Sequence, residues 1–192
     1  MTPANTTGTG DTTLYYGDLN NSHELQVFIE LRDRASYRMA ESLLGTIRQA
    51  ADEGKFVVKF HFAGVMDETI GGTGSQRSLS ALAAASDVGQ KQFMEYLAAL
   101  FEAQPFPPGN DDFSDASVLL SVADKVNGLR STEFDQKVTG STYMTWAGEV
   151  IGDFGSFGVV GTPVVWYDDE NIPVEKIGGG PAITPQEFLS QL

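Results

Sequence analysis

The chain contains no cysteine, and only two of its 192 residues, His23 and His61, are histidines. Without a thiol there can be no disulfide, thiolate nucleophile, zinc–thiolate site or iron–sulfur cluster. Two histidines are also too few for a multi-histidine metal centre, and we expect no metal site. Every apolar run is shorter than the ~18 residues of a membrane span, and the residues after Met1 do not predict a signal peptide.

Basic residues are scarce as well. Twelve lysines and arginines stand against 26 aspartates and glutamates, for a formal net charge of −14. A surface of that sign repels both the phosphate backbone of a nucleic acid and an anionic lipid headgroup. We therefore expect no nucleic-acid partner and no contact of this chain itself with a membrane.

The composition predicts a globular protein with a polar N-terminal segment. Hydrophobic residues make up 41% of the chain and charged residues 20%, enough for a sizeable core. Residues 1–12 are mostly Thr, Gly, Asn and Pro, which predicts a flexible leader. Such a segment is compatible with a stalk, whose membrane anchor would then precede Met1, and equally with a frayed terminus.

Strand patterns stand near both ends of the chain. Apolar and β-branched runs predict strands over residues 14–16, 25–31, 56–62, 164–167 and 172–177. Between the second and third of these, apolar residues recur at helical spacing from Asp33, a favourable N-cap, to Gly54. A strand–helix–strand unit implies parallel pairing, whereas the four residues 168–171 predict an antiparallel hairpin between the last two strands.

The middle of the chain, residues 66–157, predicts a series of helices. The strands before and after this block need each other to build one sheet. We therefore expect an α/β domain formed by residues 13–65 and 158–192, with the helical block as an insertion. The chain ends on a helix that begins at Thr184, where Pro185 and Glu187 complete a capping box.

This order resembles that of DsbA-like disulfide oxidoreductases, which have a thioredoxin-like fold with an inserted α-helical domain. Val27–Leu31 stands where that family has the strand leading into the active site, and Asp33-Arg34-Ala35-Ser36 falls where it has Cys-x-x-Cys. Gly158–Pro163 is similar to the loop that holds a cis-proline beside the active site, and residues 92–101 are similar to a family helix ending in Ala-Leu-Phe.

The resemblance extends over residues 24–192 and departs from the family at both cysteines, which are replaced by Asp33 and Ser36. Thiol–disulfide exchange requires a thiolate, so the resemblance implies a relative that has lost this chemistry. It also implies a groove between Asp33 and the Thr162–Pro163 loop that binds an extended polypeptide or a partner protein. No catalytic residue and no cofactor is expected. The candidate binding residues are Asp33, Arg34, Ser36, Thr162 and Pro163.

Each candidate also has a simpler interpretation. Thr162 would offer backbone groups for strand addition, or a cis bond to Pro163 would only fix the hairpin geometry. Asp33 could serve only as an N-cap, and we expect Ser36 to face solvent in the first helical turn. We expect His61, which lies within an apolar strand, to be a satisfied core or edge residue rather than a base.

Two further functions stay open at this point. A glutathione-type transferase or isomerase would set a cofactor thiol beside Ser36, although the carboxylate of Asp33 would repel its thiolate. Its cationic candidates are Arg32, Arg34 and Arg38. The third possibility is a purely structural interaction domain whose groove is filled. The family association implies an extracytoplasmic location, secreted or membrane-anchored, and the sequence leaves a cytoplasmic one open.

Overall fold

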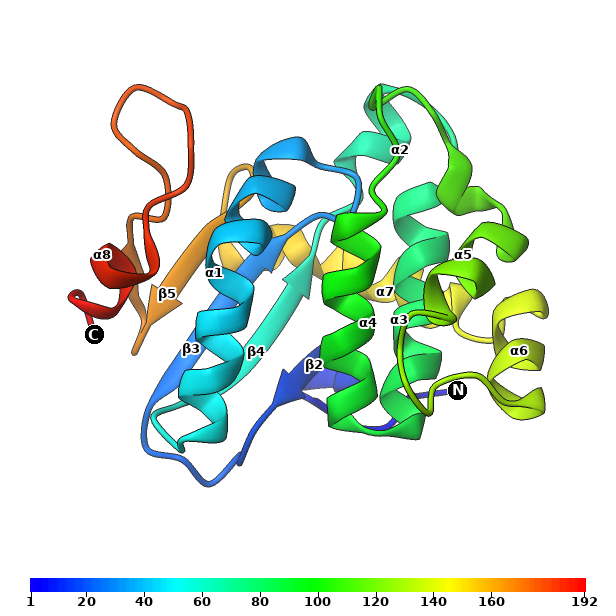
Figure 1. Cartoon of the computed structure of the whole chain (residues 1–192), viewed down its shortest axis with the longest axis horizontal. Helices are drawn as coiled ribbons and strands as arrows, with labels where there is room; N and C mark the ends of the chain where they lie inside the picture. Colours follow the sequence, from blue (N-terminus) through cyan, green and yellow to red (C-terminus); the bar gives the residue numbers. More distant parts are fainter.

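The computed structural model describes residues 1–192, which fold around one six-stranded sheet (Figure 1). Its strands are β1 (Thr6–Thr7), β2 (Thr13–Tyr16), β3 (Glu24–Ile29), β4 (Val57–Phe62), β5 (Val164–Tyr167) and β6 (Glu170–Ile172). They lie in the order β1-β2-β4-β3-β5-β6, and only β3 and β4 run parallel to each other. The parallel pair and the final antiparallel hairpin confirm the predictions from sequence.

The helices connect the strands and end the chain. They are α1 (Arg34–Asp52), α2 (Val65–Thr69), α3 (Gly74–Val88), α4 (Gln90–Glu102), α5 (Ala116–Ala123), α6 (Thr132–Thr139), α7 (Met144–Asp153) and α8 (Pro185–Leu189), with short 3-10 turns η1 (Thr9–Asp11), η2 (Asp112–Ser114) and η3 (Phe154–Phe157). α1 connects β3 to β4, and α2 to α7 lie between β4 and β5 in the chain. This is the α/β, thioredoxin-like fold with an inserted helical segment.

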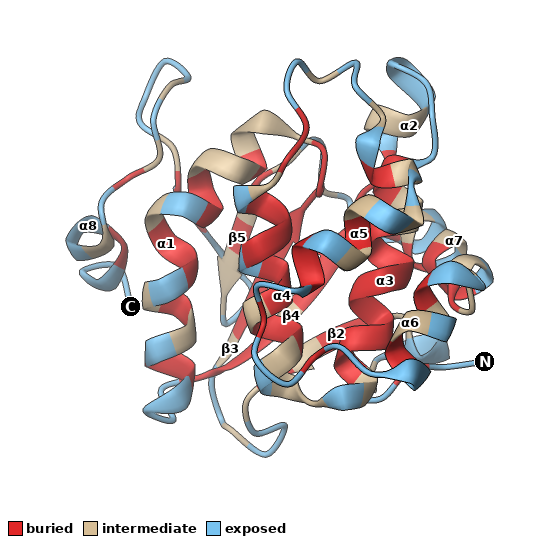
Figure 2. Cartoon of the chain, turned by 45° about the vertical axis from the view of Figure 1, so that its right-hand side comes forward, coloured by how far each residue is buried: buried red, intermediate tan, exposed pale blue.

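One core unites the sheet and the insertion. α1 and α4 lie in front of the sheet in Figure 1, and α7 lies behind it. Val27 of β3, Leu43 of α1 and Leu97 of α4 belong to one continuous cluster of buried side chains. Figure 2 shows the buried residues concentrated between these layers. No helix combines the length and the apolar character that a membrane crossing requires.

Residues 1–12 depart from the flexible leader expected of them. β1 pairs with β2, the backbone N–H of Ala4 donates to Asp87 Oδ1 at 2.8 Å, and Asn5 Nδ2 donates to the carbonyl of Ser86 at 2.9 Å. Hydrogen bonds rather than apolar contacts hold most of the segment, so a polar composition could not reveal that it packs.

The C-terminal hairpin also differs from the expectation. Its turn has two residues rather than four, because Asp168 and Asp169 both adopt left-handed backbone angles (φ 47° and 67°). β6 ends at Ile172, since Pro173 has no N–H with which to continue the ladder. Glu175 pairs with Ala182 in an isolated bridge instead, and the loop between them protrudes from the body (Figure 1).

Candidate functional site

Asp33 joins the start of α1 to the loop that precedes β5. Its Oδ2 accepts hydrogen bonds at 2.9 Å from the backbone N–H of Ser36, from the Ser36 hydroxyl and from the Thr162 hydroxyl. The first of these satisfies a free N–H at the helix start, which confirms Asp33 as the N-cap. The structure therefore brings together three of the five candidate residues, and we call Asp33, Ser36 and Thr162 the Asp33 site.

The prediction that Ser36 faces solvent is wrong. Ser36 is fully buried, and its hydroxyl accepts the backbone N–H of Glu30 at 3.1 Å while donating to Asp33. The end of β3 lies directly behind the first turn of α1, so the hydroxyl satisfies a backbone donor that would otherwise be left unpaired. Asp33, by contrast, is half-buried, which makes it the accessible member of the pair.

The cis-proline loop (residues 158–163) presents free backbone groups beside Asp33. The Thr162–Pro163 bond is cis, as expected for this loop, and Pro163 is buried. Thr162 is half-buried, and neither its N–H nor its carbonyl makes a hydrogen bond within the chain. Gly161 adopts a φ of +78°, which a side chain would disfavour, so that the loop turns just before Thr162.

Arg34 lies beside the Asp33 site rather than in it. Its guanidinium carbon stands 3.9 Å from the centre of the Tyr37 ring and 5.2 Å from the centre of the Phe106 ring. Phe106 is 67% exposed and belongs to the insertion. The nearby Gln104 holds this part of the insertion in place, because its Nε2 donates to the carbonyls of Leu31 and Asp33 at 2.9 and 3.0 Å. Sequence reasoning missed Gln104 and Phe106, which carry no motif.

Arg32 is a structural residue, which overturns its candidacy as a cofactor-binding cation. Its side chain is only 1% exposed, and Nη1 lies 2.7 Å from Asp67 and 3.3 Å from Asp111. The guanidinium also donates to the backbone carbonyls of Gly71 and Pro108. This group ties the end of β3 to two loops of the insertion, and its burial keeps it from a ligand carboxylate.

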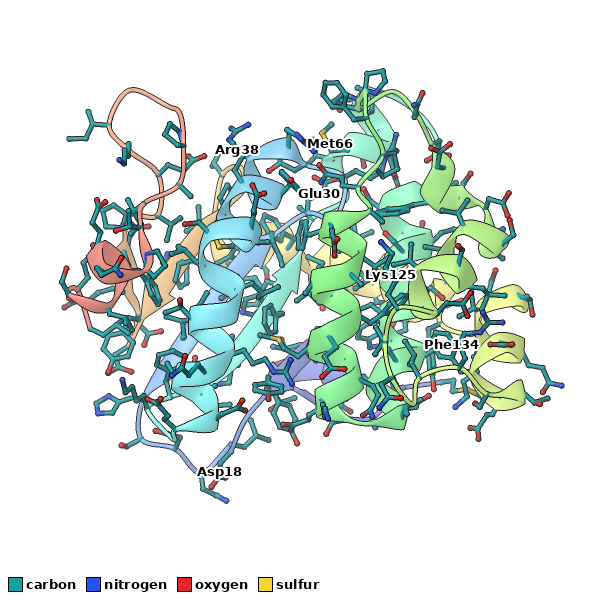
Figure 3. All side chains as sticks on the ribbon, viewed as in Figure 1. Asp18, Glu30, Arg38, Met66, Lys125 and Phe134 are labelled. Carbon is teal, nitrogen blue, oxygen red and sulfur yellow. The ribbon has the colours of Figure 1, made fainter.

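Glu30 is a second buried group that sequence reasoning missed. The residue is 2% exposed, and its Oε1 accepts from the backbone N–H of Met66 at 2.7 Å and from the Ser75 hydroxyl at 2.9 Å. Figure 3 shows Glu30 and Met66 near each other at the end of β3. Burial raises the pKa of the Glu30 carboxyl, against the lowering effect of these two hydrogen bonds. A carboxylate within the apolar run of residues 25–31 was the available signal.

Two shallow cavities lie near the site. One, of about 270 Å³, borders Pro163 and Val164 on the side of β6. The other, also about 270 Å³, lies between α1 and α4 and is lined by residues that include Tyr37, Leu44 and Phe101. The Asp33 site itself offers hydroxyl, carboxylate and free backbone groups, which suits hydrogen bonding to a ligand rather than covalent chemistry.

A family model described as thioredoxin matches residues 9–189. Among solved structures, the chain is similar to MdbA, a thiol-disulfide oxidoreductase from Actinomyces oris, with a TM-score of 0.74 and 18% identity over 94% of this chain and 86% of that one. Reduced DsbA from Mycobacterium tuberculosis gives a TM-score of 0.71 and 16% identity over 92% and 85% of the two chains.

Oxidised BdbD from Bacillus subtilis is also similar, with a TM-score of 0.69 and 14% identity over 89% of this chain and 88% of that one. No curated protein matches the sequence. At these identities the structural likeness establishes the fold.

Proposed function

Because the chain belongs to the thioredoxin family but has no cysteine, we propose that it is a redox-inactive, DsbA-like protein that binds an extended polypeptide at the cis-proline loop. The polypeptide is a free chain or an exposed segment of a partner protein. The observation that carries this proposal is the pair of unbonded backbone groups of Thr162, next to a half-buried Asp33.

Free backbone groups favour binding by strand addition. An extended peptide can donate to the Thr162 carbonyl and accept from its N–H, as a strand adds to a sheet edge. This pairing requires no thiol, so it is compatible with the loss of both cysteines. Few main-chain bonds must offset the ordering of the peptide, and we expect an affinity of about micromolar.

The surroundings of the site favour basic peptides with apolar side chains. Phe106 is 67% exposed and Val160, within the cis-proline loop, is 95% exposed, so both can contact an apolar side chain. The net charge of −14 attracts a basic chain at long range. Added salt should weaken that attraction because it screens exposed charges.

A small thiol cofactor has less support. Asp33 places a carboxylate at the position where a cofactor thiolate would approach, and Arg32 is engaged inside the protein. We also propose that the protein is located outside the cytoplasm, either secreted or anchored to a membrane. Fractionation of cells that express the full native gene product tests it, and recovery in the cytoplasm alone would contradict it.

The test of binding is an NMR titration with matched peptides. One basic peptide has an ordinary backbone, and its control has the same sequence with every second amide N-methylated, which removes hydrogen-bond donors but leaves charge unchanged. We expect shifts at Gly161, Thr162 and Asp33 with the first peptide only. Equal binding of both would refute strand addition. No shifts at millimolar peptide, or shifts only at distant residues, would leave a structural interaction domain.

A further inference from the structure

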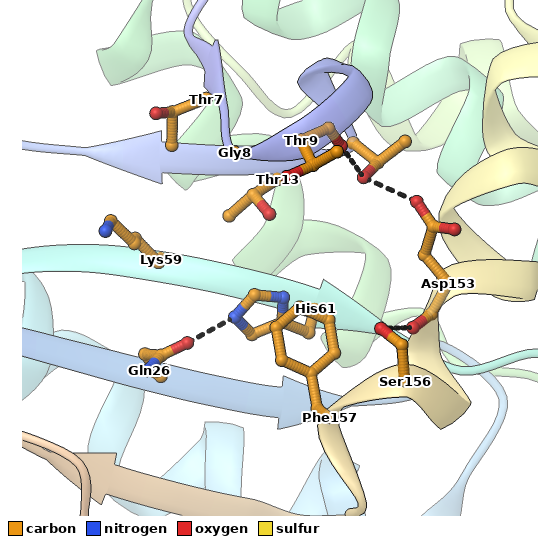
Figure 4. A pocket seen from close by; sticks show the side chains of 11 residues that line it. Thr7, Gly8, Thr9, Thr13, Gln26, Lys59, His61, Asp153, Ser156 and Phe157 are labelled. Atoms are coloured by element: carbon orange, nitrogen blue, oxygen red, sulfur yellow. Dashed lines mark hydrogen bonds between the residues drawn. The ribbon is translucent and has the colours of Figure 1, made fainter.

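A polar pocket of about 360 Å³ lies on the sheet face opposite α1, separate from the Asp33 site (Figure 4). Its floor comes from three neighbouring strands, with Thr13 on β2, Gln26 on β3 and His61 on β4. The segment Thr7–Thr12 forms one wall, and the end of α7 with η3 forms the other. The packed N-terminal segment thus contributes one wall of the pocket.

The floor of the pocket is polar. A sheet face that is covered by another segment of the chain is ordinarily apolar. Side chains alternate along a strand, and the neighbours Leu14, Val27 and Phe60 point into the core on the other face. Gln26 is 9% exposed and His61 is 4% exposed. Buried polar groups cost stability unless they are hydrogen-bonded, so the side chains of Gln26 and His61 need hydrogen-bond partners.

These floor groups are only partly satisfied within the chain. His61 Nε2 lies 2.9 Å from Gln26 Oε1, and Gln26 Nε2 donates to Asp169 at 3.2 Å. The expectation of a satisfied histidine therefore holds for Nε2 only, since the other ring nitrogen, Nδ1, makes no hydrogen bond within the chain. In Figure 4 this nitrogen lies on the side of Thr13 and Thr9. Since an Nε2–H donates to Gln26, Nδ1 carries a lone pair that can accept a hydrogen bond.

The charge state of His61 fits this role. Burial, assisted by the charge of Lys59, lowers the pKa of His61 to about 4. The ring is therefore neutral at pH 7, and it packs against Phe28 and Phe157 with ring centres 4.5 and 4.1 Å apart. A neutral imidazole and an amide together offer acceptors and donors without a net charge.

The other residues that line the pocket disfavour anionic and apolar ligands. Thr12 donates to Asp153 Oδ2 at 2.8 Å, and the Ser156 hydroxyl lies at the exposed rim. Lys59 forms an ion pair with Glu24, so it is not a free cation for a phosphate or carboxylate. Phe157 is the sole hydrophobic residue of the lining, which disfavours an apolar ligand.

We propose that this pocket binds a neutral polyhydroxylated molecule of monosaccharide size. The ligand hydroxyls would exchange hydrogen bonds with His61 Nδ1, the threonine hydroxyls and the Asp153 carboxylate. One face of the ligand would rest on the Phe157 ring, because an aromatic ring packs well against C–H groups. The volume of the pocket is within the ~300–1,000 Å³ typical of small-molecule sites.

The experiment is an NMR titration of the full chain with D-glucose, D-galactose and myo-inositol, each to about 50 mM, where a millimolar site saturates. We expect saturable shifts at Thr9, Thr12, His61 and Phe157 with at least one probe, and none at Thr162. Inorganic phosphate serves as the anionic probe. No saturable shift with any of the three polyols, or tighter binding of phosphate, would overturn the proposal.

Two variants test the location. Gln26→Met removes the amide from the floor and should weaken polyol binding about tenfold or more. The matched control is Gln49→Met, the same change at an exposed position of α1, which should leave binding unchanged. If Gln26→Met does not fold, Ser156→Leu at the exposed rim blocks the mouth instead. Unaltered binding in whichever variant folds would show that the ligand lies elsewhere.

Discussion

The Thr162 hydroxyl donates a hydrogen bond of 2.9 Å to the Asp33 carboxylate, joining side chains 129 positions apart in the chain. This bond connects the start of α1 to the cis-proline loop, the two segments that carry the active site in redox-active relatives according to the resemblance. The same carboxylate oxygen also accepts from Ser36. If the resemblance is right about the position of the first cysteine, a hydrogen-bonded carboxylate occupies that position in this chain.

The first prediction concerns the stability that Asp33 contributes. Asp33→Ala should lower the free energy of unfolding by about 1–2 kcal/mol, because the helix loses its N-cap. Thr162→Val should cost less, since it removes only the bond between segments. A double-mutant cycle measured by urea denaturation should give a coupling of about 0.5–1.5 kcal/mol between the two residues. Additive effects would mean that the bond does not form in solution.

Asp115 provides the matched control for this experiment. It caps α5 by accepting from Ser117, and its side chain makes no hydrogen bond or ion pair with a second segment of the chain. Asp115→Ala should therefore show no coupling to Thr162→Val.

Most of the fold and the main residues of the Asp33 site could be predicted from the sequence. Strand periodicity and the family resemblance together placed Asp33 and Thr162 at one groove, although neither residue type is diagnostic. The burial of Ser36 could not be predicted from the sequence, because a serine in a first helical turn ordinarily faces water. Its position depends on the N–H of Glu30, a tertiary contact that no local pattern encodes.

The insertion shows the same limit. Phe106 and Gln104 border the site from a proline-rich loop. The prolines predict that the preceding helix ends there, but they do not predict where the loop packs. Arg32 stands in an otherwise apolar stretch, and its partners Asp67 and Asp111 are distant in sequence. Contacts of this kind depend on how the insertion packs, so periodicity alone cannot predict them.

The second prediction tests the inherited geometry of the helix start. The hydroxyl of Ser36 lies 2.9 Å from Asp33 Oδ2, so the two side chains already meet. The variant with Asp33→Cys and Ser36→Cys should form an intramolecular disulfide under mild oxidant, detected as a mass loss of two hydrogens by mass spectrometry. A variant with Ser36→Cys alone should stay reduced and monomeric, because its thiol is buried. Persistent free thiols in the double variant would contradict the alignment.

The third prediction concerns Arg32. Replacing this buried guanidinium by methionine leaves Asp67 and Asp111 close together without their cation. We expect a loss of about 3–5 kcal/mol in the free energy of unfolding, since breaking a buried pair strands a charge. Arg130→Met, which removes an exposed arginine that pairs with Asp124 and Asp135, should have a much smaller effect in the same denaturation assay. Similar losses in both variants would argue against a buried Arg32.

The fourth prediction concerns pH and His61. The pKa of His61 is lowered from 6.5 to about 4 by burial, so the unfolded chain binds a proton in this range and the folded chain does not. Stability should therefore be greatest above pH 6.5 and fall as the pH drops towards 4. For a full shift the loss is about 3 kcal/mol. Denaturation midpoints measured between pH 7 and 4 report it.

The variant His61→Gln separates the contribution of His61 from those of the other groups that titrate in the same range. The raised pKa of Glu30 acts in the opposite direction, because the folded chain takes up that proton more readily than the unfolded chain as the pH falls. His61→Gln keeps a neutral polar side chain beside Gln26 and removes the titration, so stability should depend less on pH. An unchanged slope in His61→Gln would mean that His61 titrates normally in the folded protein, and that its ring is not buried as the structure has it.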